Sequence, residues 1–140
     1  MLVHGTAIAV EGRAILLTGP SLSGKSDLAL RAIASGAALI ADDLVELLLV
    51  QGVLNATRLA AASPLLAIRG IGIFEPDCVA DRAPLALCVQ LDQHNDSMAL
   101  PPRLDKAGPW HDLFVPQIML NPFEASALAK LHLALTRFGF

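Results

Sequence analysis

Eight residues near the start of the chain have the types and spacing of a phosphate-binding loop. Residues 19–26 read Gly-Pro-Ser-Leu-Ser-Gly-Lys-Ser, a G-x-x-x-x-G-K-S pattern. Small residues let backbone N–H groups approach phosphate oxygens, and a following helix N-terminus adds partial positive charge. Lys25 would supply a point charge for the β- and γ-phosphates, and the Ser26 hydroxyl would ligate Mg²⁺. The candidate nucleotide-binding residues are Gly19, Ser21, Ser23, Gly24, Lys25 and Ser26.

Two adjacent carboxylates, Asp42 and Asp43, follow the next apolar run after this loop. A nucleoside triphosphatase keeps its metal-holding acid at such a place. Because neighbouring residues of a strand point to opposite faces, the two acids are expected to have different roles. One would face the phosphates and the metal, and the other would face an acceptor or a neighbouring side chain. The alternative is a polar strand end with two solvated acids.

The remaining candidates are weaker when each is taken alone. His4 is a single histidine in an expected strand, where histidine is more often structural than catalytic. Arg69 and Arg103 could each clamp an anion or pair with a surface acid, and the sequence leaves both options open. The other histidines lack metal-ligand spacing and are expected to be surface or packing residues: His94, His111 and His132.

The loop lies between segments that can position it. Residues 13–18 form an apolar run short enough for a buried strand, and residues 27–34 have helical spacing. Residues 2–10 also predict a strand, and the turn at Glu11 and Gly12 would join it to residues 13–18 as a hairpin. The strand, loop and helix together are the context that a phosphate-binding loop requires.

Further along, residues 37–41 predict a buried strand that ends at the two aspartates. Residues 44–50 predict a strand that turns back at Gln51-Gly52. Residues 92–110 contain proline, glycine, histidine and charged residues, and predict a long loop. Asn121 as N-cap, followed by Pro122, predicts the start of the last helix.

Length and composition limit the kinds of protein this can be. A chain of 140 residues predicts a single domain. The sequence is 54% hydrophobic with a mean hydropathy of +0.58, but no apolar run reaches the roughly 18 residues that span a bilayer. The apolar surplus predicts an oligomer interface. The net charge of −3 and the scattered basic residues argue against a nucleic-acid partner. Cys78 and Cys88 are expected to be packed and reduced, as in the cytoplasm.

Several short motifs occur together in a characteristic order. They are His4-Gly5, the phosphate loop followed by Asp27, Leu-Ile-Ala-Asp-Asp at 39–43, Ile-Arg-Gly-Ile-Gly-Ile at 68–73, Arg103-Leu104 and Val-Pro-Gln-Ile at 115–118. In this combination the chain resembles the catalytic domain of HPr kinase/phosphorylase, the bacterial serine kinase of the phosphocarrier HPr. Full-length members carry an additional N-terminal domain. The resemblance therefore implies a shortened form in which residues 1–140 are one catalytic domain.

The resemblance implies an α/β P-loop nucleotide-binding domain similar to phosphoenolpyruvate carboxykinase, with a mixed sheet and flanking helices. It also implies phosphate transfer from ATP, with Mg²⁺, or from pyrophosphate to a serine of HPr. Many members catalyse the reverse phosphorolysis as well. The family is hexameric, so the resemblance implies a homo-oligomer. From charge and hydropathy, neither a membrane nor a nucleic-acid partner is expected.

The resemblance also implies roles for individual residues. Lys25 and Ser26 would hold phosphate and Mg²⁺, and Asp42 would be the base that takes the seryl proton. Asp43 would support the metal. The two weaker candidates would have supporting roles, in which His4 tunes Asp42 and Arg103 contacts the transferring phosphate.

The sequence departs from the family pattern at three places. Leu22 stands where the loop usually has glycine, and Ala67 stands where a glutamate thought to assist Mg²⁺ is common. Residues 121–124 read Asn-Pro-Phe-Glu, and the family's Pro-Gly-Arg-Asn is missing. These differences keep a second function open, a nucleotide sensor that does not transfer phosphate. A small-molecule kinase is a third alternative, although no arginine-rich lid is recognisable.

Overall fold

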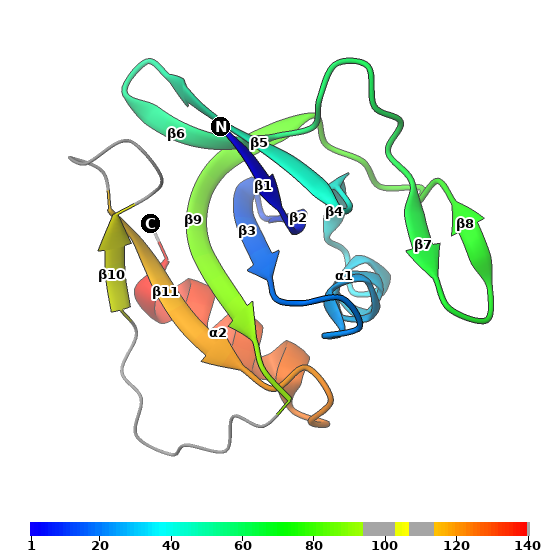
Figure 1. Cartoon of the computed structure of the whole chain (residues 1–140). Coiled ribbons are helices and arrows are strands. Elements are labelled where there is room, and N and C mark those ends of the chain that lie inside the picture. Colours follow the sequence, from blue (N-terminus) through cyan, green and yellow to red (C-terminus); the bar gives the residue numbers. More distant parts are fainter. Residues whose placement is uncertain (94–102, 107–113, 140) are drawn as a thin grey trace.

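The computed structural model describes residues 1–93, 103–106 and 114–139, in which two helices lie against a large mixed sheet (Figure 1). The helices are α1 (Lys25–Ala34) and α2 (Ala127–Phe138). The strands of the sheet are β1 (Leu2–His4), β2 (Thr6–Val10), β3 (Arg13–Thr18), β4 (Ala38–Ala41), β5 (Leu44–Val50), β6 (Val53–Thr57), β9 (Arg82–Leu91), β10 (Arg103–Lys106) and β11 (Phe114–Leu120). A separate hairpin consists of β7 (Leu66–Ile68) and β8 (Gly72–Phe74).

The long, curved strand β9 connects the two halves of the sheet (Figure 1). The strand order is β1-β5-β6-β9-β3-β2-β4, with β11 also on β9 and β10 outside β11. Strand β9 runs parallel to β3 and β11 but antiparallel to β6. This combination makes the sheet mixed, as the family resemblance implies.

Two tight hairpins follow directly from local sequence. Strands β2 and β3 meet at Val10 and Arg13, and Glu11 and Gly12 between them have φ values of 51° and 79°. The hairpin of β5 and β6 turns at Gln51 and Gly52, with φ values of 51° and 81°. Two consecutive positive φ values are typical of the turns whose twist matches that of the flanking strands. Both predicted turns are confirmed.

The strand expected over residues 2–10 is divided at Gly5. Strand β1 pairs with β5, whereas β2 pairs with β3 and β4. A Cβ atom at Gly5 would lie 2.6 Å from the carbonyl oxygen of Leu17, so this close approach requires glycine. The Gly5 N–H donates to the carbonyl of Asp43 at 3.0 Å, which places the division beside the two aspartates.

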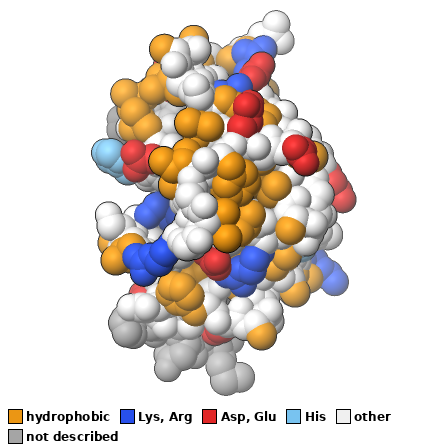
Figure 2. All heavy atoms as spheres, turned by 90° about the vertical axis from the view of Figure 1, so that its right-hand side faces the viewer, with side chains coloured by type: hydrophobic (Ala, Val, Ile, Leu, Met, Phe, Trp, Pro, Cys, Tyr) orange, Lys and Arg blue, Asp and Glu red, His pale blue; other side chains and the backbone are white. Residues whose placement is uncertain are grey.

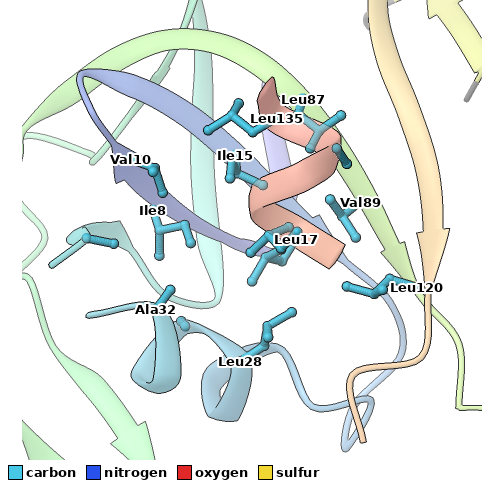
Figure 3. Close-up of a cluster of buried hydrophobic side chains, with 14 of the residues drawn as sticks. Ile8, Val10, Ile15, Leu17, Leu28, Ala32, Leu87, Val89, Leu120 and Leu135 are labelled. Carbon is cyan, nitrogen blue, oxygen red and sulfur yellow. The ribbon is translucent and has the colours of Figure 1, made fainter. Parts of the chain in front are cut away.

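Hydrophobic cores lie on both faces of the sheet. The first fills the space between the sheet and the two helices, and includes Leu17, Leu28, Leu87 and Leu135 (Figure 3). The second lies on the opposite face, where residues of β5, β6 and β9 pack against residues of β2 and β3. Much of the high apolar content is therefore buried within the described chain.

Several predictions along the chain were wrong. Cys78, which was expected to be packed, is exposed. Helix α2 begins at Ala127, with Ser126 as N-cap, and the segment before it forms turns. Part of the expected loop over residues 92–110 is strand β10, and the rest of it beyond residue 93 lies outside the described residues. Neither helix of the described chain is long and apolar enough to cross a membrane.

Candidate functional site

The candidate phosphate-binding loop connects β3 to α1, as the sequence predicts. Gly24 is the N-cap of α1 and has a φ of 96°. Gly19, with a φ of 148°, allows the loop to close, because a Cβ atom there would lie 2.7 Å from Ser23 Oγ. The N-terminal N–H groups of α1 thus lie at the same end of the helix as Lys25 and Ser26, where an anion is favoured.

The Lys25 ammonium group lies across this loop. Its Nζ donates to the carbonyl oxygens of Gly19 at 2.8 Å and Pro20 at 2.9 Å, and to Ser23 Oγ at 3.4 Å. These acceptors hold a flexible, strongly hydrated cation at the mouth of the loop. A phosphate group bound there would compete with neutral carbonyls for the ammonium, and the charged acceptor makes the stronger bond.

Asp42 contacts three different parts of the chain. Ser26 Oγ lies 3.1 Å from both of its carboxylate oxygens, and Thr6 Oγ1 donates to Oδ1 at 2.7 Å. The backbone N–H of Ala67 donates to Oδ2 at 3.4 Å. The end of β4, the start of α1, strand β2 and the β7–β8 hairpin therefore meet at one carboxylate. Thr6 is fully buried, and sequence reasoning did not single it out.

The structure does not bring every predicted residue into this cluster. Asp43 is exposed and has a φ of 76°, and its carbonyl accepts the Gly5 N–H. In the described part of the chain, the side chains of His4 and Asp43 have no hydrogen-bond or ion-pair partner. Arg103 lies on β10 opposite Gln117, and its side chain is outside the described residues.

The oxygens at this site fit Mg²⁺. Ser26 offers a hydroxyl that lies beside the Asp42 carboxylate, and hard oxygen groups of this kind suit the ion. Among residues 1–93, 103–106 and 114–139 there is no group of three histidine, cysteine or acidic side chains that could hold a metal. A usual magnesium site has one or two carboxylates that act together with water and substrate phosphates.

A pocket of about 380 Å³ opens beside the loop. One wall is the loop and the start of α1, and the other is the β7–β8 hairpin, which projects beyond α1 (Figure 1). Its lining residues are Leu22, Ser23, Gly24, Lys25, Ser26, Asp27, Ala67, Ile68, Arg69 and Phe123. Figure 2 shows the face that carries the hairpin, where hydrophobic, basic and acidic side chains are all exposed. Ligand pockets commonly have volumes of about 300–1,000 Å³.

Arg69 and Leu22 are two features of this pocket that bear on the sequence expectations. Arg69 is exposed, and none of the ion pairs of the described chain includes it. Leu22 has a φ of 66° and is 77% exposed. A left-handed conformation at leucine costs roughly 1–2 kcal/mol, which glycine at this position would avoid.

The fold and the site together define the class of domain. It is an α/β domain in which a glycine-rich loop leads into a helix N-terminus, and a carboxylate contacts the serine at the end of this loop. Residues 1–119 match the model of a family described as the HPr Serine kinase C-terminal domain. The chain therefore belongs to this family.

Individual relatives agree with the family match. The HPr kinase/phosphorylase of Clostridium kluyveri is 42% identical over 73 residues, which are 52% of this chain and 24% of that protein. The HPr kinase/phosphorylase of Treponema pallidum is 34% identical over 105 residues, which are 69% of this chain and 33% of that protein. The chain thus spans about a quarter to a third of the curated relatives it matches.

The fold is also similar to a solved structure, that of the Hpr(Ser) kinase/phosphatase from Coxiella burnetii. The TM-score is 0.77 over 97% of this chain and 92% of that chain. The sequence identity is 22%, so this likeness supports the mixed-sheet fold alone.

Proposed function

We propose that residues 1–140 act as one catalytic domain that transfers phosphate from ATP to a serine of an HPr-type phosphocarrier protein. The observation that carries the proposal is the contact of Ser26 Oγ with both carboxylate oxygens of Asp42 at 3.1 Å. It joins the loop that would hold the triphosphate to the acid that would act on the acceptor. Family membership supplies the reaction class.

In this proposal the loop N–H groups and Lys25 bind the β- and γ-phosphates. Ser26 would hold Mg²⁺ and Asp43 would support it from its exposed position just after β4, so that the bound ion could neutralise part of the phosphate charge. Asp42 takes the proton of the acceptor hydroxyl as the seryl oxygen bonds to the γ-phosphorus, and the bridging oxygen leaves with ADP. Because Asp42 also contacts Ser26, the base lies directly beside the expected metal position.

Two further residues have supporting roles in the proposal. His4, on the strand that precedes Thr6, would tune Asp42. Arg103, on β10, would contact the transferring phosphate. The reverse phosphorolysis of phosphoserine by inorganic phosphate would use the same groups in the opposite direction.

Incubation with Mg-ATP and a purified HPr-type phosphocarrier, followed by mass spectrometry of the carrier, tests this function. We expect one phosphate on a serine with the wild type and none with Lys25→Ala, because that variant lacks the charge that offsets the phosphates. A carrier that stays unmodified while calorimetry detects ATP binding would exclude the kinase.

That result would favour the second candidate, a nucleotide sensor without phosphotransfer. The observation behind it is Ala67, which approaches Asp42 through its backbone N–H at 3.4 Å. At this position the methyl side chain cannot ligate a metal. Ala67→Glu is the substitution to make first, and a gain of transfer to the carrier would identify the missing carboxylate as the reason for inactivity.

A further inference from the structure

Phe123 is an exposed aromatic residue on the wall of the pocket. It is 55% exposed, although it lies in a turn packed against the loop. A Cβ atom at Gly24 would lie 3.3 Å from Phe123 Cζ and 2.9 Å from Pro122 Cγ. The ring is therefore next to the loop but free on much of its surface. An aromatic residue in such a position is not needed to fill the core.

The turn that carries this ring is fixed by several interactions. The Phe123 N–H donates to Asn121 Oδ1 at 3.0 Å, and the Arg31 guanidinium donates to the carbonyl of Pro122. Arg31 is itself held by Asp27, one turn earlier in α1, at 3.2 Å. The helix that follows the loop thus positions the turn, and with it the aromatic ring.

We propose that Phe123 is the surface against which the base of the nucleotide stacks. The ligand class is the purine ring of a nucleoside triphosphate, and the inference rests on the proposed binding of ATP at this loop. Aromatic side chains bind bases through their faces, which requires exposed ring surface and a neighbouring phosphate site. Both conditions hold at Phe123.

The position of the ring along the loop indicates that it would contact the base of the ligand and not the reacting phosphate end. The γ-phosphate must face Ser26 and Asp42, which are in contact with each other. Phe123 instead packs at Gly24 and shares the pocket with Arg69 on the opposite wall. A guanidinium can also stack on a ring, so Arg69 would be able to cover the second face of the base.

The test compares a ligand that has a base with one that lacks it. Affinities for Mg-ATP and for Mg-tripolyphosphate are measured by calorimetry for wild type, Phe123→Ala and Phe123→Tyr. Removing one stacking partner weakens base binding by roughly 5- to 150-fold. We expect a loss in this range for ATP with Phe123→Ala, no change for tripolyphosphate, and near wild-type binding with Phe123→Tyr. Phe138→Ala is the matched control, since Phe138 is also exposed but lies at the end of α2.

The other outcomes overturn the inference in distinguishable ways. Equal losses for ATP and tripolyphosphate would mean that Phe123 only supports the loop through Gly24. An unchanged ATP affinity, or a wild type that binds ATP no more tightly than tripolyphosphate, would mean that the base does not stack there. If the wild type binds neither ligand, the proposed function fails and the stacking surface fails with it.

Discussion

At the residue scale, the environment of Asp42 depends most on Thr6. The hydroxyl of this fully buried residue donates to Asp42 Oδ1 at 2.7 Å. Hydrogen bonds to a charged group contribute about 1.5–3 kcal/mol to stability, and they also fix the direction of the carboxylate. Thr6 therefore positions Asp42 from a fully buried place in the sheet.

Thr6→Val should lower the free energy of unfolding by about 1.5–3 kcal/mol in urea denaturation, because valine keeps the shape but loses the donor. Thr6→Ser should restore most of the loss. Thr57→Val is the matched control, since Thr57 Oγ1 is buried and has no partner among the described residues, and its removal should be neutral or stabilising. Equal losses for Thr6→Val and Thr57→Val would show that the contact with Asp42 has no special energetic role.

A second prediction distinguishes the roles of the two aspartates. Asp42→Asn keeps size and polarity but cannot accept the seryl proton, so phosphotransfer at saturating Mg-ATP should fall by roughly 10²–10⁴ while nucleotide binding survives. Asp43→Asn should instead raise the Mg²⁺ concentration needed for half-maximal transfer. If both variants weaken Mg-ATP binding equally and neither slows transfer, the acids share a metal role and the assignment of a base to Asp42 is wrong.

The site residues that could be predicted from the sequence all belong to motifs. Lys25 and Ser26 belong to the loop pattern and Asp42 to an acidic pair, so type and spacing were sufficient to select them as candidates. Thr6 and Phe123 belong to no such pattern. They reach the site through the pairing of β2 with β4 and through the turn before α2, contacts that a linear sequence does not display.

At the scale of elements, local sequence patterns predicted the structure correctly where it depends on residues that are neighbours in the sequence. The turns at Glu11-Gly12 and Gln51-Gly52 need only positive φ values, which their residues accept. The predicted start of the last helix was wrong. The Asn121 side chain accepts the Phe123 N–H in a turn, and α2 begins only at Ala127. Asparagine and proline are common both in turns and at helix starts, and here the packing of this segment against the loop selects the turn.

That packing leads to a prediction at Gly24. An alanine there would have both a positive φ and a Cβ atom 2.9 Å from Pro122 Cγ, so Gly24→Ala should destabilise by more than the strain alone. Gly52→Ala is the matched control, because Gly52 also has a positive φ but no atom of the described chain lies within 4 Å of the added Cβ. Thermal unfolding should give a larger loss for Gly24→Ala. Equal losses would mean that the turn yields easily and does not press on the loop.

At the scale of the whole molecule, β9 explains both what could be predicted and what could not. The alternation of strands and the early hairpin indicate a mixed α/β domain, as the structure has it. The pairing of one long strand with β6, β3 and β11 is non-local, and no spacing in the sequence specifies it. The second core, to which β9 contributes Ala83 and Leu85, buries part of the apolar surplus that led to the expectation of an oligomer interface.

Even so, exposed hydrophobic residues remain, and they predict that the protein assembles. Ile71 at the turn of the β7–β8 hairpin is 77% exposed, and Ile73 on β8 is 71% exposed. Adjacent apolar side chains on a projecting hairpin favour a protein interface. We expect light scattering to give a mass that is a multiple of the 14.7 kDa chain.

The hairpin's part in that assembly can be separated from general surface effects. Ile71→Lys should shift the mass toward that of a single chain, because a charge at an apolar contact must be desolvated without a partner. Leu133→Lys is the matched control, since Leu133 is also exposed but lies on α2, where the same charge should leave the mass unchanged. A single-chain mass for the wild type at high concentration would refute assembly. If Ile71→Lys still has the mass of the oligomer, the interface lies on another surface, and the hairpin serves only as a wall of the pocket.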